Sequence, residues 1–195
     1  MQQRVSMNHK IIKYLYRGRI LCCLLAMCLL LSGCELIGLS GKEDKIAAGL
    51  SCLEEKKYDE AIAAFQEAVE AETDIGEAYR GIGIALWEQE QYSEAKEAFK
   101  KALINGSMKT GTIYNFLGIC SLKEEDLDSA LTYFETGIRC EKEGSVLQQE
   151  MEFNVIAIYE KKLEWETAKA KMEAYITKYP DDEKAAKEAE FLRTR

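Results

Sequence analysis

The chain has very little proline and histidine. Pro180 is its one proline among 195 residues, and abundant Ala, Glu, Lys and Leu favour an all-helical fold. The one histidine, His9, lies near the N-terminus, so residues 34–195 have no imidazole for acid–base catalysis or metal binding. Gly81-Ile-Gly83 lacks the third glycine of a dinucleotide loop. We therefore expect no enzyme activity, no cofactor and no bound metal.

Acidic residues are missing from the first 33 positions. This segment holds five basic residues, which leaves 21 basic and 34 acidic residues in the remainder, a net charge of −13. Such an acidic body argues against phosphate binding and against electrostatic attraction to anionic lipid. No nucleic-acid partner is expected.

The N-terminus has the layout of a targeting segment. A basic stretch ending at Arg19 is followed by twelve apolar residues, 20–31. At about 1.5 Å per residue, they are too short to cross a hydrocarbon core of roughly 30 Å. They fit the apolar region of a secretory signal. The next residues, Leu31-Ser32-Gly33-Cys34, resemble the bacterial lipobox.

The lipobox resemblance implies that Cys34 carries a diacylglycerol and that the chain is cut before it. Two or three acyl chains anchor a protein stably to a membrane, whereas a single acyl chain gives only marginal membrane binding. We expect residues 1–33 to be a lipoprotein signal peptide and residues 34–41 the lipidated cysteine and its tether. The body then lies at the extracytoplasmic face of a bacterial cell membrane. An uncleaved signal anchor and a freely secreted form are the alternatives.

Five kinds of residue recur about every 34 positions. The first copies are Gly49, Tyr58, Ala61, Phe65 and Ala68, then Gly83, Tyr92, Ala95, Phe99 and Ala102, then Gly118, Leu127, Ala130, Phe134 and Gly137. A looser fourth copy has Ile156, Trp165, Ala168, Met172, Tyr175 and Pro180. This pattern resembles the tetratricopeptide repeat (TPR).

The TPR resemblance implies an all-α fold, an α-solenoid of about four helical hairpins with a C-terminal capping helix. We expect a TPR array over 42–195, with repeats at about 42–75, 76–110, 111–148 and 149–182 and the cap at 183–195. A generic bundle of helical hairpins is the alternative.

The repeat also predicts how the hairpins pack. The glycines Gly49, Gly83 and Gly118 should face Ala61, Ala95 and Ala130 where paired helices cross. The rings of Phe65, Phe99 and Phe134 should fill the space between units. N-caps of the second helices are expected from Asp59, Ser93 and Asp128. Three cysteines of the body are expected at buried positions: Cys52, Cys120 and Cys140.

The first helices of such repeats line an inner surface, which the resemblance identifies as a peptide-binding groove. The residues expected to form it are Ile46, Leu50, Leu53, Arg80, Ile84, Trp87, Asn115, Ile119, Leu122 and Phe153. Leu50, Ile84, Ile119 and Ala157 stand where many family members carry the asparagine of a carboxylate clamp, so that clamp is not expected. A mostly aliphatic groove edged by acid favours an amphipathic helix or an apolar segment. The alternative is that these side chains only complete the core.

These features predict a membrane-anchored scaffold or adaptor that binds other envelope proteins or peptides. The alternative is a structural homo-oligomer built by stacking of repeat faces between copies.

Overall fold

A computed structural model describes residues 45–195, which form one compact unit. The predicted signal peptide, Cys34 and the tether lie outside the described residues. Within 45–195 the regular structure is entirely helical. It consists of a helix over 45–54 followed by α2 (Tyr58–Glu70), α3 (Ile75–Glu88), α4 (Tyr92–Ile104), α5 (Gly111–Lys123), α6 (Leu127–Cys140), α7 (Val146–Lys161), α8 (Trp165–Lys178) and α9 (Glu183–Leu192).

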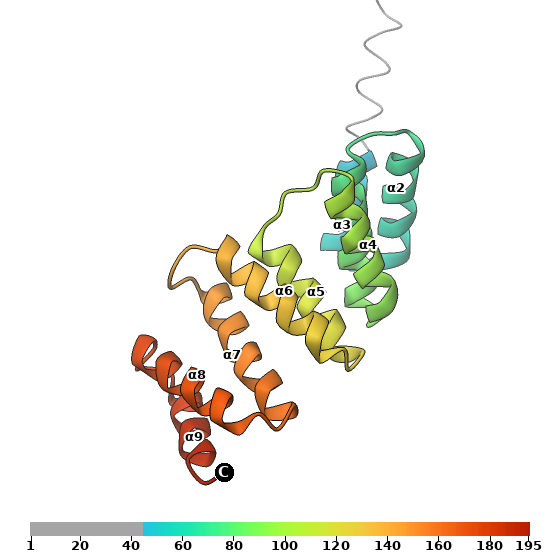
Figure 1. The fold of residues 1–195 in the computed structure, drawn as a ribbon. Coiled ribbons are helices and arrows are strands. Elements are labelled where there is room, and N and C mark those ends of the chain that lie inside the picture. The colour runs from blue at the N-terminus through green and yellow to red at the C-terminus, as the bar shows by residue number, and fades with distance from the viewer. Residues whose placement is uncertain (1–44) are drawn as a thin grey trace, which may run out of the picture. The chain divides into compact units, whose positions relative to one another are not determined.

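The helices form hairpins that follow one another along the chain (Figure 1). Each helix from α2 onward packs against the next, and the first helices of successive hairpins also touch, α3 against α5 and α5 against α7. Because every contact joins near neighbours in sequence, the core is a row of small clusters. The prediction of an α-solenoid with a final capping helix is confirmed.

Phenylalanine rings, not alanines, are the nearest neighbours of the repeat glycines. A Cβ at Gly49 would lie 2.6 Å from Cε1 of Phe65, and one at Gly81 of the next hairpin would also collide with that ring. The same ring thus touches glycines of two hairpins, which confirms that it fills the space between units. The phenylalanine ring is thus the first contact of each repeat glycine, and Ala61 is itself fully buried.

The predicted N-caps are wrong, because the second helices begin two residues earlier than a cap at those positions requires. Asp59 and Asp128 lie inside the first turns of α2 and α6, and Ser93 lies inside that of α4. The α6 cap is Asp126, whose Oδ1 accepts from Ser129 N at 3.1 Å; α2 and α4 have no side-chain cap.

Asp59 and Asp128 instead connect successive hairpins. Asp59 Oδ1 accepts from Nε2 of Gln89, the residue that ends α3, at 2.7 Å. Asp128 Oδ1 accepts from Nζ of Lys162, at the end of α7, at 2.8 Å. Each carboxylate therefore connects the second helix of one hairpin to the C-terminal end of the first helix in the next hairpin.

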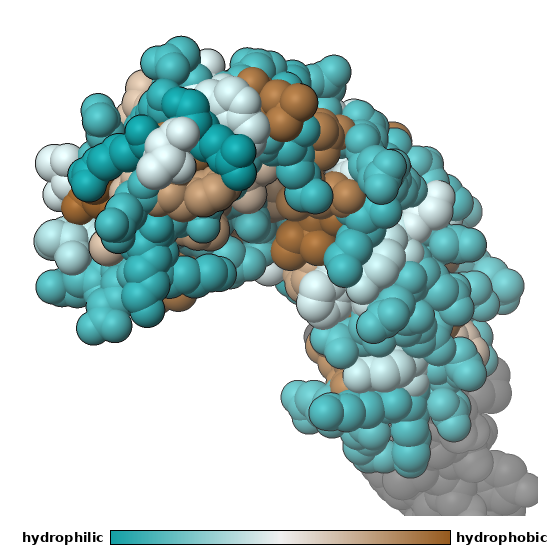
Figure 2. All heavy atoms as spheres, turned by 90° about the horizontal axis from the view of Figure 1, so that it is seen from below, coloured by the Kyte–Doolittle hydropathy of each residue, from teal (hydrophilic) through white to brown (hydrophobic). Residues whose placement is uncertain are grey.

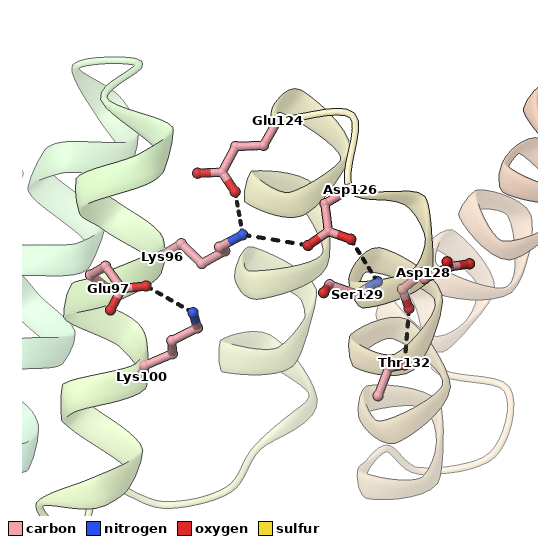
Figure 3. Close-up of polar contacts among 8 residues, drawn as sticks. All are labelled: Lys96, Glu97, Lys100, Glu124, Asp126, Asp128, Ser129 and Thr132. Atoms are coloured by element: carbon pink, nitrogen blue, oxygen red, sulfur yellow. Dashed lines mark hydrogen bonds and ion pairs between the residues drawn. The ribbon is translucent and has the colours of Figure 1, made fainter.

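Lys96 makes the corresponding connection between the second and third hairpins (Figure 3). This buried lysine of α4 forms an ion pair with Glu124, and its Nζ lies 3.9 Å from Oδ2 of Asp126. Asp126 also caps α6, so the short joint between α5 and α6 both begins a helix and contacts the preceding hairpin through Lys96.

The three cysteines within residues 45–195 are free, and their burial differs. Cys120 is fully buried, which raises the pKa of its thiol to about 12, and Cys52 is partly buried. Cys140 is exposed, so its predicted burial is wrong. It is the last residue of α6, where the buried face of the helix has already ended.

The joint before α7 is capped by serine. Ser145 Oγ accepts from Gln148 N at 3.1 Å, and α7 begins at Val146. The helix therefore starts three residues before the predicted start of the fourth repeat.

Asp182 organises the start of α9. Its Oδ1 accepts from the backbone N–H groups of Lys184 at 3.1 Å and Ala185 at 3.0 Å. Its Oδ2 accepts from Tyr175 Oη at 2.8 Å and Gln149 Nε2 at 3.2 Å. These donors, led by the Ala185 N–H, lower the pKa of this carboxyl below its ordinary 3.8.

We expect Asp182→Ala to destabilise the chain at neutral pH by about 1 kcal/mol, through loss of the cap. Because the folded pKa is depressed, the carboxylate's contribution is present above pH 3.8 and is lost as pH falls through the folded value. Thermal unfolding of both proteins at neutral pH and below pH 3.8 checks this, with the exposed neighbour Asp181→Ala as control. An unfolding difference that persists unchanged in acid would contradict the assignment.

Candidate functional site

The inner face of the array is built by the first helices, 45–54, α3, α5 and α7. Successive first helices touch, whereas cavities separate α2 from α4 and α6 from α8. A stack whose members approach on one side and separate on the other bends toward the closer side. In Figure 2 the described residues enclose a hollow, where hydrophobic side chains gather between hydrophilic ones.

Aromatic packing occupies the middle of this face. Trp87 meets Phe116 edge to face with ring centroids 5.1 Å apart, and Phe116 stacks on the buried Phe99 at 5.0 Å. Trp87 is only partly buried, but its Nε1 is enclosed without a hydrogen-bond partner. Its ring thus belongs to the core and borders the inner face. Phe116 was not among the residues predicted from the sequence. It lies 35 residues after Gly81, and both pack on a repeat phenylalanine, Gly81 on Phe65 and Phe116 on Phe99.

Asn115 and Glu150 form a polar point on the inner face. Asn115 is buried on α5, and its Nδ2 donates to Glu150 Oε1 of α7 at 3.4 Å. Its Oδ1 is enclosed without a partner. Glu150 is exposed, so its carboxylate remains open to a ligand. Glu150 was not among the residues predicted for the groove, although it occupies the same place in its repeat as Glu77.

Arg80 is exposed but not an isolated cation. It forms an ion pair with Glu77, one turn earlier on α3. Glu77 Oε1 also accepts from Ser107 Oγ at 2.9 Å. The pairing neutralises much of the charge, so Arg80 by itself does not make an anion site.

The other predicted groove residues differ in exposure. Leu50 is 46% exposed, which makes it the most accessible large apolar side chain on this face. Ile46 and Leu53 pack on the core cluster around Phe65, and Ile84 packs on the cluster around Phe99. Ile119 and Leu122 pack on the cluster around Phe134 while remaining partly exposed.

Phe153 is partly covered by neighbouring side chains. Its ring meets Tyr175 edge to face at 5.6 Å, and Lys184 Nζ of α9 lies 5.1 Å from its centroid. The C-terminal helix thus closes this end of the inner face. The predicted residues come from successive first helices, and Phe153 also packs against the C-terminal cap.

Three family models described as Tetratricopeptide repeat match residues 53–106, 80–141 and 156–182, which together exceed half of the chain. The chain belongs to the tetratricopeptide repeat family.

Solved TPR structures have the same fold. YrrB, described as a TPR protein with an unusual peptide-binding site, is 23% identical with a TM-score of 0.67, over 77% of this chain and 75% of its own. MamA residues 41–end from Desulfovibrio magneticus RS-1 are 19% identical with a TM-score of 0.66, over 79% and 84%. Pseudomonas aeruginosa pilF is 16% identical with a TM-score of 0.58, over 80% and 68%. Comparison with curated proteins gives no match.

Two cavities of the TPR array lie between second helices. One of about 550 Å³ separates α2 from α4 over α3, and one of about 490 Å³ separates α6 from α8 over α7. The second has an apolar floor that includes Val155 and Ile156 and a mixed rim with Glu135, Arg139 and Lys171. None of the predicted groove residues lines either cavity.

The described part of the TPR array contains no cluster of three or more His, Cys, Asp or Glu side chains arranged to hold a metal. Over the same range, every helix is too short or too polar to span a bilayer.

Proposed function

We propose that the protein is an adaptor, lipid-anchored through Cys34 at the extracytoplasmic face of a bacterial membrane, that binds an apolar or amphipathic segment of another envelope protein. The binding surface is the inner face of the TPR array. The action is non-catalytic: the surface offers shape, apolar contact and a few polar points.

The observation that carries this proposal is the partly exposed apolar surface shared by consecutive first helices. Residues one turn apart share a helix face, which places Asn115, Ile119 and Leu122 together on α5. Ile84 and Trp87 share the facing side of α3, and Leu50 extends the surface onto 45–54. An apolar strip of this kind suits the apolar face of a helix, with anchors three and four residues apart.

The charge of the protein indicates the polar side of the ligand. The chain after residue 33 carries a net charge of −13, and Glu150 presents an open carboxylate beside the strip. Basic residues flanking the ligand's apolar face would be attracted to this surface. YrrB, which has the same fold, is itself described as peptide-binding.

Site-specific photo-crosslinking in the full-length, membrane-bound protein tests the assignment. A benzophenone amino acid at Leu50, Arg80 or Glu150 should give a discrete adduct with a second protein. The same group at Glu60, Glu97 or Glu166, exposed on second helices, should not. An adduct of twice the monomer mass from the inner positions would favour the homo-oligomer. Equal labelling from both sets would contradict the assignment.

We expect Leu50→Ser to weaken binding of the captured segment about tenfold or more, because burying one large apolar side chain contributes roughly 1.5–3 kcal/mol. Folding should be unaffected, since Leu50 is exposed. Titration calorimetry measures the affinity, and Leu163→Ser, at a more exposed leucine (68%) in the joint after α7, is the control. Unchanged affinity in the Leu50 variant, or an equal loss in both, would place the ligand elsewhere.

A further inference from the structure

One edge of the array carries exposed apolar side chains on successive hairpins. Ile104 ends α4 and is 81% exposed; Met108 lies in the joint before α5 and is 74% exposed. Val146 begins α7 and is 82% exposed. Side chains this accessible contribute nothing to the core. We call these three residues and their joints, 104–110 and 141–146, the apolar edge.

The apolar edge is also the edge at which the described chain begins. The first helices all start there and the second helices all end there, since the hairpins are antiparallel. Figure 1 shows the α2–α3, α4–α5 and α6–α7 joints along the same side of the array. The helix that starts at Lys45 therefore begins beside them.

The distance to the anchor favours this edge over the opposite one. Cys34 and Lys45 are eleven residues apart, which spans at most about 40 Å when fully extended. A first helix such as α3 has 14 residues, so the opposite edge lies about 21 Å farther along the helix axes. A lipid on Cys34 thus brings the apolar edge, before any other surface, within reach of the bilayer.

The two joints of the apolar edge carry no net charge, because Lys109 and Lys142 balance Glu141 and Glu143. The α2–α3 joint on the same side of the array is acidic, with Glu72 and Asp74, but carries no exposed large apolar side chain. The opposite edge differs: Leu163 stands alone in its joint, and Phe191, 41% exposed, has the Arg195 guanidinium 4.6 Å from its ring centroid. The two edges therefore differ in how much free apolar surface they offer.

We propose that the apolar edge inserts Ile104, Met108 and Val146 into the headgroup–acyl boundary of the bilayer that holds the lipid. This rests on the proposed anchor at Cys34. A lipid alone leaves a tethered body free to rotate, whereas a second, weak apolar contact fixes its orientation. The helix axes are then roughly perpendicular to the membrane plane. The inner face of the array faces sideways, toward a partner on the same membrane.

The test uses the full-length lipidated protein, with Cys52→Ala and Cys140→Ser to remove the accessible thiols. An environment-sensitive dye is attached to Lys109→Cys, beside Met108, or to Leu163→Cys on the opposite edge. Each protein is placed in phosphatidylcholine vesicles. We expect the dye at 109 to emit at shorter wavelength and to be quenched by nitroxide-bearing lipids, and the dye at 163 to behave as in water.

Substitutions distinguish membrane contact by the apolar edge from attachment by the lipid on Cys34. The triple variant Ile104→Ser, Met108→Ser, Val146→Ser should still float with vesicles, but the dye at 109 should lose its shift and quenching. Leu163→Ser should leave both signals unchanged. Equal water exposure at 109 and 163 in floating protein would overturn the edge contact alone.

Two further outcomes are decisive. Flotation no greater than that of Cys34→Ala would overturn the anchor and the edge contact with it. A shift at 109 that is present without vesicles would assign the apolar edge to contact between copies of the protein and overturn the membrane contact.

Discussion

Gly83→Leu should lower the free energy of unfolding by at least about 3 kcal/mol, which is about 6–12 °C in the midpoint for a domain of this size. Gly83 is buried on α3, and a Cβ there would lie 2.7 Å from Cε1 of Phe99 and 2.8 Å from its Cδ1. Movement of that ring is restricted, because it is fully buried and Phe116 is stacked on it with centroids 5.0 Å apart. Thermal and urea unfolding followed by circular dichroism measure the change.

A smaller substitution gives the sharper form of this test. Gly83→Ala gains about 1 kcal/mol of helix propensity, so destabilisation by alanine would isolate the contact with Phe99. Adding Phe99→Leu should recover part of the loss, since the collision is with the ring. Ala48→Leu, at an exposed position beside Gly49, is the control and should change little. Unaltered stability in Gly83→Leu would show that the hairpins do not pack as described.

The sequence was sufficient to predict the architecture, because each repeat contacts only its neighbours. Gly83, Phe99 and Ala102 recur at spacings set by two helices and their joints, so periodic positions encode local contacts. The individual side-chain contacts could not all be predicted from the repeat. A two-residue difference in the start of α6 turned Asp128 from an expected cap into a contact with Lys162.

The candidate site was predictable only in part, for a physical reason. Helical periodicity places Ile84 and Ile119 on the inner face, but burial of a partly apolar face depends on neighbouring helices that the pattern does not describe. Phe153 shows this most clearly, because α9 and Tyr175 partly cover it. The pairing of Asn115 with Glu150 joins residues of two different repeats and likewise required coordinates.

Removing α9 should have an effect comparable to Gly83→Leu and should also change the oligomeric state. Ala185, Ala189 and Leu192 are buried in one cluster with Met172 and Tyr175 of α8. A chain ending at Pro180 would expose that apolar face. Each large apolar side chain returned to water costs about 1.5–3 kcal/mol, so we expect a loss of about 3–5 kcal/mol. Thermal unfolding measures it.

The same truncation should convert the chain into a concentration-dependent oligomer. The uncovered face of the last hairpin would accept a repeat from another copy, and such a head-to-tail contact has no built-in closure. Multi-angle light scattering across a dilution series should show growing mass for the chain ending at Pro180. A chain ending at Arg193, which keeps α9, should match the full-length profile. If the shorter chain remains monomeric and equally stable, α9 is not a cap. Open-ended growth on its removal would instead show that this short helix restricts self-stacking and leaves the inner face as the surface for other proteins.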